Sequence, residues 1–332
     1  RRDAFPHDHG REPARRAGTG ADSRAGCRGD DLDGMEHQGR YRAVASVPQP
    51  LPAAWLITFG YRTIPQVYLR NAALAPSYAP MKQTPIAPFD LPEAQPFLLE
   101  GSDTGYLFFH GFTSTPQSVR EVAEKVHEIS GATVYCPRLA GHGETPSALA
   151  KTGQADWVAS AEDALATLSK RCSRVIVGGL SVGATLSLNL AARMPDKIQG
   201  VVSINGSTGL YRPEVVAPLY EADGPAFIEG IGSDIAEPER TEICYDRIPR
   251  DTLKERFLLT NATGALLPLI RQPIQIMQSR CDNVVDPENA LRIATSVRSS
   301  EIQLNWLERS YHVATLDYDR GKIARRIAGF LA

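Results

Sequence analysis

The sequence lacks the features that would assign it to a membrane-spanning, nucleic-acid-binding or disulfide-rich class. Its 332 residues contain no apolar run long enough to cross a bilayer. The formal net charge is −2, so there is no cationic surplus that would favour binding to nucleic acid or to an anionic membrane surface. Stable membrane insertion is not expected either. The five cysteines are odd in number and none forms a CxxC pair. This pattern predicts reduced thiols in a cytoplasmic protein rather than a disulfide framework or a zinc site.

Large apolar side chains are scarce at the beginning of the chain. Residues 1–47 are rich in Arg, Asp, Gly and Ala, and such a segment cannot bury enough surface to offset its ordering entropy. We interpret it as a disordered tail or as a mis-assigned start, because Met35 and Met81 lie further along. Residues 48–96 carry many prolines and are predicted to form an irregular lead-in.

From residue 97 onward, short apolar runs alternate with helical patterns. The runs of strand length are Tyr106–Phe109, Thr133–Tyr135, Val175–Val177, Val201–Ile204, Ile274–Met277 and Ile302–Leu307. Apolar residues at helical spacing occur within 119–129, 157–168 and 323–330. This alternation predicts an α/β fold with a mainly parallel central sheet and helices on both faces. Active sites of such sheets lie at the carboxyl ends of the strands.

One stretch interrupts the alternation. Between Gly206 and about Gly264 there is no further clean strand, and five prolines are spread along the segment. We therefore predict an α/β core formed by residues 97–206 and 264–332. Residues 207–263 are predicted to be a small inserted cap that lies over the strand ends.

The motif that points most directly to chemistry is Gly179-Leu180-Ser181-Val182-Gly183. It follows the apolar run 175–177 and precedes the helical pattern 184–191. A sharp turn between strand and helix exposes the serine oxygen, and the glycines let the two elements approach closely. The helix N-terminus favours developing negative charge. Ser181 is therefore the candidate nucleophile, and the alternative is a buried turn serine.

A nucleophilic serine needs a base, and the base needs a carboxylate that orients it. In folds with this serine turn, the chain order is serine, acid, histidine. His312 is the only histidine after Ser181, so it is the candidate base. The alternative for His312 is a loop histidine without a catalytic role.

The acid has more than one candidate. Asp282 follows the run 274–277 within a few residues, from where its carboxylate could reach across the strand ends to His312. We favour it over Asp286, which precedes Pro287 and is interpreted as a helix N-cap. Asp317 and Asp319 precede the C-terminal helical pattern and receive the same N-cap interpretation.

An oxyanion needs two backbone N–H donors. One is expected from Val182, the residue after the nucleophile, and the other from the loop that follows an early strand. That loop is 110–114, in which Gly111 allows the turn and Phe112 is expected to supply its N–H. The Phe112 ring would border the acyl pocket, and the alternative is simple core packing.

Taken together, these residues resemble the bacterial monoacylglycerol lipases and the small carboxylesterases of Bacillus type. The matching segments are His110–Thr113, Gly141–Gly143, Thr145-Pro146, Asp156-Trp157, Gly179–Gly183, Gly230–Ile235, Asp282–Val285 and Ser310–Asp317. The resemblance runs from about residue 97 to the end. The chain departs from the family at Asn283, where a histidine is common, and at Ala184, where a further glycine is frequent.

The resemblance implies an α/β-hydrolase fold with a triad of Ser181, Asp282 and His312. It implies an oxyanion hole formed by the N–H groups of Phe112 and Val182. Substrate-binding residues would be Phe112 together with Ile231 and Glu242, which would meet the alcohol part of a monoglyceride. His142 fits a structural turn of the family, and we assign it no catalytic role.

The expected activity is hydrolysis of carboxylic esters, namely monoacylglycerols or other acyl esters of short to medium chain length. No metal or organic cofactor is expected, and the partner is a small-molecule substrate. Two alternatives remain open at this point, because a fold does not fix a function. One is a thioesterase or another acyl hydrolase that uses the same triad, and the other is a non-catalytic binding protein.

Overall fold

The computed structural model describes residues 89–211 and 213–332. The predictions for residues 1–88, a tail and most of the lead-in, lie outside the described residues. The strands are β1 (Phe97–Leu99), β2 (Ser102–Phe109), β3 (Ala132–Cys136), β4 (Arg174–Leu180), β5 (Gly200–Ile204), β6 (Phe227–Glu229), β7 (Arg247–Pro249), β8 (Ile274–Ser279) and β9 (Ile302–Leu307). The α-helices are α2 (Gln117–Ser130), α3 (Pro146–Leu149), α4 (Gln154–Ser169), α5 (Val182–Arg193), α6 (Pro213–Val216), α7 (Arg250–Leu266), α8 (Glu288–Ser296) and α9 (Arg320–Leu331). Short 3₁₀ turns are η1 (Pro92–Ala94), η2 (Pro195–Lys197), η3 (Ala217–Tyr220) and η4 (Leu267–Leu269).

Seven strands form one mainly parallel sheet in the order β1-β3-β2-β4-β5-β8-β9. All six predicted strands are present. The central strands have the continuous apolar runs of strands covered on both faces, whereas β9 lies at the sheet edge and is mostly exposed or half-buried. Within this sheet, the strand that the sequence did not reveal is β1, which pairs antiparallel with β3 at the edge. It spans three half-buried residues, too few to establish an alternating pattern.

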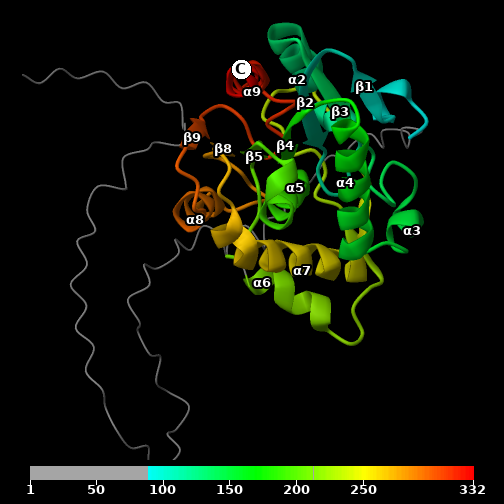
Figure 1. Cartoon of the computed structure of the whole chain (residues 1–332). Helices are drawn as coiled ribbons and strands as arrows, with labels where there is room; N and C mark the ends of the chain where they lie inside the picture. Colours follow the sequence, from blue (N-terminus) through cyan, green and yellow to red (C-terminus); the bar gives the residue numbers. More distant parts are fainter. Residues whose placement is uncertain (1–88, 212) are drawn as a thin grey trace, which may run out of the picture. The chain divides into compact units, whose positions relative to one another are not determined.

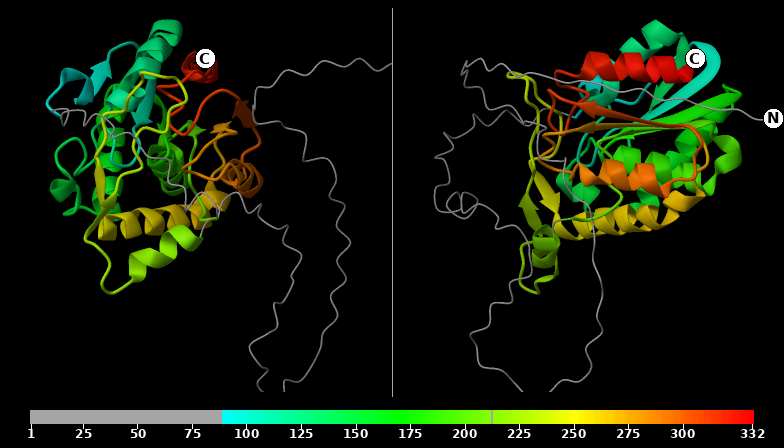
Figure 2. Two further views of the ribbon diagram at one scale, coloured as in Figure 1. Left: turned by 180° about the vertical axis from the view of Figure 1, so that it is seen from behind. Right: turned by 90° about the vertical axis from the view of Figure 1, so that its left-hand side faces the viewer.

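Helices cover both faces of the sheet (Figures 1 and 2). On one face, α2 and α9 enclose a core of apolar side chains, whereas α4, α5 and α8 enclose a second core on the opposite face. Helix α2 ends at Gly131, whose φ of 66° is favourable for glycine. Ile129, the last of the apolar residues at helical spacing in 119–129, lies near the last turn of the helix and is exposed. The predicted α/β fold is confirmed.

The segment between β5 and β8 contains more regular structure than its sequence suggested. Its short strands β6 and β7 pair antiparallel as a separate two-stranded sheet. They escaped prediction because each has only three residues. Helix α7 follows directly and packs on α5, and it extends across the predicted end of the cap at residue 263. The predicted cap limits, residues 207 and 263, therefore remain a prediction.

The described cysteines differ in their covalent state. Cys136, Cys172 and Cys244 are free thiols. Cys281 is disulfide-bonded, so the expectation that every cysteine is reduced is wrong at this position. The chain's odd cysteine count and the absence of a CxxC pair gave no signal for this bond.

Candidate active site

Ser181 sits in a strained turn between β4 and α5. Its φ of 56° and ψ of −117° are unusual for a residue with a side chain. Strain of this kind is concentrated at functional sites, where the surrounding structure holds the backbone in place. The serine follows the last residue of β4 directly and precedes the first residue of α5, as the sequence motif predicts.

The two glycines of the motif are required by close backbone contacts. A Cβ atom on Gly179 would lie 2.1 Å from the carbonyl carbon of Gly183. A Cβ atom on Gly183 would lie 2.4 Å from the backbone oxygen of Phe109, at the end of β2. Only glycine therefore lets α5 begin this close to β4 and β2. The close approach brings the turn carrying Ser181 next to the loop that follows β2.

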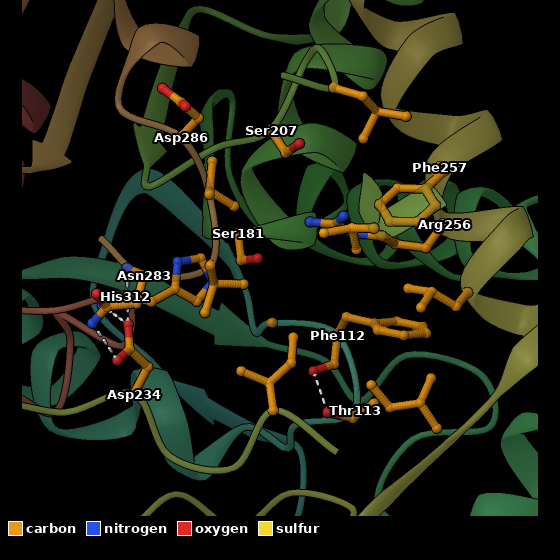
Figure 3. A pocket seen from close by; sticks show the side chains of 18 of the residues that line it. Phe112, Thr113, Ser181, Ser207, Asp234, Arg256, Phe257, Asn283, Asp286 and His312 are labelled. Carbon is orange, nitrogen blue, oxygen red and sulfur yellow. Dashed lines mark hydrogen bonds between the residues drawn. The ribbon is translucent and has the colours of Figure 1, made fainter. Parts of the chain in front are cut away.

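His312 and Asp282 form a direct pair beside this turn. The ring Nδ1 of His312 lies 3.0 and 2.9 Å from the two carboxylate oxygens of Asp282. Ser181 and His312 line the same pocket, and Figure 3 shows the serine hydroxyl and the imidazole there. The three side chains come from the ends of β4, β8 and β9, which lie close together because these strands run parallel.

The Asp282 carboxylate is fixed by donors on its own loop. Oδ1 accepts the backbone N–H groups of Val284 at 2.9 Å and Val285 at 2.8 Å. Oδ2 accepts the Nε2 amide of Gln278 at 3.2 Å. The side chain is fully buried. A buried carboxylate with this many donors is held in one orientation.

Asp286, the alternative acid, has a different role. Its Oδ1 accepts the backbone N–H of Glu288 at 2.9 Å, at the beginning of α8. This is the capping contact that the sequence indicated. Among the described residues, the carboxylate that contacts the imidazole ring of His312 is that of Asp282.

The loop that carries His312 is tied to the ends of β5 and β8. Asn205 donates its amide to the backbone oxygen of His312 at 2.7 Å. The Ser279 hydroxyl donates to the backbone oxygen of Tyr311 at 2.8 Å, and its N–H donates to Asn205 Oδ1 at 2.7 Å. Asn205 is buried and has a positive φ of 47°, a conformation that asparagine tolerates better than most residues. These bonds fix the loop relative to the sheet.

Asp234, from the predicted cap, reaches the same loop. Its Oδ2 accepts the backbone N–H of His312 at 2.9 Å, and its Oδ1 accepts the Asn283 amide at 2.8 Å. Asn283 is the residue where the family commonly has histidine. The carboxylate of Asp234 therefore joins the acid loop, the histidine loop and the predicted cap segment (Figure 3).

The N-cap interpretation of Asp317 and Asp319 is wrong for their side chains. Asp319 occupies the N-cap position of α9, but its carboxylate makes no cap bond and accepts Arg309 N–H and Ser310 Oγ at 2.9 Å. Asp317 is fully buried and accepts backbone N–H groups from both this loop and the predicted cap. Its donors are Ala236, Glu237, Tyr311 and Tyr318, at 2.7–3.0 Å. The two carboxylates shape the His312 loop instead of capping a helix, because nearby unpaired N–H groups compete for them.

The loop after β2 carries Phe112, whose N–H is the second donor predicted for an oxyanion site. His110 is buried, with its Nδ1 2.9 Å from the Gly111 oxygen and its Nε2 accepting the Leu139 N–H at 3.1 Å. Burial lowers the pKa of His110 to about 3, so the ring stays neutral and keeps both contacts. Thr113 has a strained φ of 63°. Within the described part of the chain, the N–H groups of Phe112 and Val182 donate to no protein acceptor.

Phe112 both borders the pocket and packs against the core. Its ring contacts Trp157 and His142, with ring centroids 5.5 and 5.8 Å away. The two interpretations of Phe112 from the sequence are thus compatible. His142 is buried, its Nδ1 bonds the Ala140 oxygen at 2.9 Å, and burial lowers its pKa to about 4. These contacts fit the structural role assigned to it.

The pocket around Ser181 has a free volume of about 310 Å³, within the range of small-molecule sites. Ile231 and Glu242, the residues named by resemblance, both line it, and Ile231 is largely exposed. Most other lining side chains are apolar. Among the described residues, no group of three or more His, Cys, Asp or Glu side chains could hold a metal ion.

Nearby acidic groups govern the titration of His312. Burial by itself would lower its pKa, but the charge of Asp282 and the hydrogen bond that Asp282 accepts from the ring act in the opposite direction. The charges of Asp234 and Glu242 add to this effect, so the pKa of His312 is raised above its ordinary value. Burial raises the pKa of Glu242. The imidazole is thus surrounded by groups that stabilise its protonated form.

Several residues of the site were not singled out from the sequence. Asn205 and Ser279 directly follow or end strands of the sheet, so their polarity at strand ends was an available signal. Asp234 lies in a segment that carried the resemblance, although no role was assigned to it. Arg256 gave no signal, because an arginine within a helix is usually solvated.

Comparison with known proteins agrees with this architecture. The family described as the alpha/beta hydrolase fold matches residues 107–227. The thermostable monoacylglycerol lipase of Bacillus sp. (strain H-257) is 40% identical over 240 residues, which cover 72% of this chain and 94% of the relative. The carboxylesterase of Bacillus subtilis (strain 168) is 31% identical over 240 residues, which cover 71% of this chain and 96% of that relative.

A solved structure from work on two metagenome-derived lipolytic enzymes, LipS and LipT, is also similar. It superposes with a TM-score of 0.70 at 39% sequence identity, and the match covers 73% of this chain and 98% of the solved chain. Sequence identity at this level over nearly the full length of each relative reflects a common family as well as a common fold. The chain therefore belongs to the bacterial monoacylglycerol lipase and carboxylesterase family of the α/β-hydrolase fold.

Proposed function

We propose that this protein is a serine hydrolase that cleaves carboxylic esters, with Ser181 as nucleophile, His312 as base and Asp282 as orienting acid. The observation that carries the proposal is the buried Asp282–His312 pair in the pocket that also contains the strained Ser181. The family membership of the chain supports the same reaction, since its relatives are named as a monoacylglycerol lipase and a carboxylesterase.

The first half of the reaction forms an acyl-enzyme. The Ser181 oxygen attacks the ester carbonyl carbon while His312 takes the hydroxyl proton. The resulting oxyanion accepts the N–H groups of Phe112 and Val182, which have no other acceptor among the described residues. The bond to the alcohol oxygen then breaks, and His312 gives its proton to the leaving alcohol. Asp282 stabilises the imidazolium that exists between these two steps.

The second half releases the acid. Water enters the position that the alcohol has left, and His312 takes its proton as it attacks the acyl carbon. The second tetrahedral intermediate collapses, Ser181 regains its proton and the carboxylic acid leaves. This sequence needs no electron acceptor and no co-reactant other than water.

The proposed substrates are monoacylglycerols or other small esters with short to medium acyl chains. The apolar lining of the pocket suits an acyl chain, and a volume of about 310 Å³ suits a small molecule. Ile231 and Glu242 are proposed to contact the alcohol portion. Among the described residues, no helix has both the length and the apolar character needed to span a membrane. A cytoplasmic location is part of this proposal.

A panel of substrates with a labelling control tests the proposal. The wild-type protein is expected to hydrolyse monoacylglycerols and 4-nitrophenyl esters, and to react with a fluorophosphonate probe. Ser181→Ala is expected to abolish both. Equal labelling of the wild type and Ser181→Ala, or no labelling of either, would show that Ser181 is not an activated nucleophile. Preference for acyl-CoA over all oxygen esters would favour the thioesterase alternative.

A further inference from the structure

Arg256 is a buried cation in the pocket that contains Ser181, and no carboxylate of the described residues pairs with it. Its guanidinium carbon lies 5.0 Å from the centroid of the Phe257 ring, an aromatic contact that does not neutralise the charge. Arg256 is the one Lys or Arg among the described residues that line this pocket, and only 9% of its surface is exposed. It forms no ion pair and no hydrogen bond with another described residue. By contrast, the half-buried Arg320 pairs with Glu121 and Glu237.

The guanidinium of Arg256 has N–H donors that bond to no acceptor among the described residues. It presents five N–H donors in a planar arrangement that matches the two oxygens of a carboxylate. Burying such a charge without a partner is costly, and buried charges in proteins are normally paired. Burial lowers the pKa of Arg256 to about 10, while the charge of Asp282 opposes this. The side chain therefore remains cationic at neutral pH.

The carboxylates of the pocket do not meet this need. Asp234 is bonded to His312 and Asn283, and Asp286 is bonded to the beginning of α8. Asp234 and Glu242 both act on the charge of His312. Asp234 and Glu242 are thus associated with the histidine, whereas Arg256 enters the pocket from α7. Glu229 also lines the pocket, but it is exposed and forms no ion pair with Arg256. Figure 3 shows His312 and Asp234 on one side of Ser181, and Arg256 and Phe257 on the other.

The order of events in ester hydrolysis assigns the two sides of the pocket. His312 must reach the leaving oxygen to protonate it, so the alcohol lies on the side of His312. The acyl chain then extends to the opposite side, toward Arg256. There the chain meets an apolar cluster that includes Ile248, Leu253 and Phe257. Methylene groups can pack on these side chains, and a cation lies beside them.

We propose that Arg256 binds a carboxylate at the far end of the acyl group, so that the preferred substrates are monoesters of dicarboxylic acids. This inference rests on the proposed esterase function and specifies its acyl class. The guanidinium would donate two N–H groups to the two oxygens of the substrate carboxylate, which would be its missing anionic partner. A plain fatty acyl chain would leave the cation unpaired, because a methyl terminus offers it no acceptor.

The test compares three ethyl esters of the same acyl backbone length. These are monoethyl adipate, its uncharged counterpart diethyl adipate, and ethyl hexanoate. For the wild-type protein, kcat/KM is expected to be at least about tenfold higher for monoethyl adipate than for either neutral ester. Adipate is expected to inhibit the hydrolysis of ethyl hexanoate more strongly than hexanoate does. A wild type that hydrolyses the charged ester no faster than the neutral esters would overturn the inference.

Variants of Arg256 separate binding from a structural effect. Arg256→Met is expected to lower kcat/KM for monoethyl adipate by at least about tenfold and to leave the neutral esters unchanged or faster. Arg256→Lys should retain part of the preference. Arg271→Met, which removes an exposed cation elsewhere, should retain all of it. Equal losses on all three esters would mean that Arg256 only supports the fold, and the inference would be wrong.

The same measurements keep this inference separate from the proposed function. If the wild type hydrolyses ethyl hexanoate and Ser181→Ala does not, the esterase assignment stands whatever the result with adipate. If the wild type hydrolyses none of the esters, the proposed function itself is wrong. If Arg256→Met does not fold, inhibition of the wild-type protein still tests the inference. Inhibition of ethyl hexanoate hydrolysis by adipate that is no stronger than inhibition by hexanoate would contradict it.

Discussion

Asp234 and His312, 78 residues apart in the chain, are joined by a 2.9 Å hydrogen bond from the histidine backbone N–H to the aspartate Oδ2. The same carboxylate accepts the amide of Asn283, beside the acid of the proposed triad. The predicted cap is therefore attached to both loops that carry the base and the acid. This attachment means that the predicted cap is coupled to the backbone position of His312.

The two candidate acids should respond very differently to the same substitution. Asp282→Asn places an amide N–H₂ group against the ring Nδ1 of His312 and disrupts the orienting pair. We expect kcat to fall by a factor of about 10³ to 10⁴. Asp286→Asn removes only a contact at the beginning of α8, and kcat should change less than about threefold. Steady-state kinetics on a 4-nitrophenyl ester measure both, and a larger effect at Asp286 would reverse the assignment.

The activity should fall in acid as His312 becomes protonated. Because its pKa is raised, the acid limb of kcat/KM is expected above the ordinary histidine pKa of 6.5. Glu242→Gln removes one of the negative charges that stabilise the imidazolium, which lowers the pKa of His312. The acid limb should then move to lower pH. A matched removal of the exposed carboxylate in Asp163→Asn should leave the limb in place.

An unchanged or alkaline-shifted limb in Glu242→Gln would contradict this account. The pH profile is best taken with a neutral ester, so that ionisation of the substrate does not contribute. The base must be unprotonated to accept the Ser181 proton, so the direction of the shift follows from the sign of the charge removed.

The glycines around the nucleophile offer a matched pair of substitutions. Gly183→Ala would place a methyl group 2.4 Å from the Phe109 backbone oxygen, and neither backbone can move without breaking the turn. We expect a loss of more than about 3 kcal/mol of stability, together with the activity. In Gly111→Ala the nearest atom, the Cβ of Ser181, would lie 3.8 Å away, an ordinary contact. This variant should fold like the wild type in thermal unfolding, and comparable destabilisation of both would contradict the close-approach argument.

The sequence was sufficient to predict the parts of the fold that depend on local patterns. Continuous β-branched runs such as Val175–Val177 identified the central strands, because a strand buried on both faces has no polar alternation. The Ser181 turn was predictable because it is defined by neighbours in the chain. The chain order of serine, acid and histidine then singled out His312, without information on its contacts.

The contacts that hold the site together could not be predicted in the same way. Asp317 has the local pattern of a helix cap, but its donors include Ala236 and Glu237, about 80 residues earlier. Nothing in the neighbourhood of Asp317 indicates that those N–H groups lie beside it in the fold. Arg256 shows the same limitation, because an unpaired arginine is recognised only when the surrounding side chains are known.

Asp317 and Asp319 therefore give a test of how carboxylates shape the His312 loop. Each carboxylate oxygen of Asp317 accepts two backbone N–H groups. In Asp317→Asn one of these oxygens becomes an amide N–H₂ group, which would face two N–H donors. Since the side chain is fully buried, we expect a loss of about 3 to 5 kcal/mol of unfolding free energy.

Asp319→Asn should destabilise the protein much less, because a single oxygen of Asp319 accepts both the Arg309 N–H and the Ser310 hydroxyl. The amide oxygen of asparagine can take that position and keep both bonds, and we expect a loss of about 1 kcal/mol or less. Urea unfolding of the two variants at neutral pH measures the difference directly. If they were equally destabilised, net charge rather than the number of donors would govern the loop. The two-sided coordination of Asp317 would then not be what anchors His312.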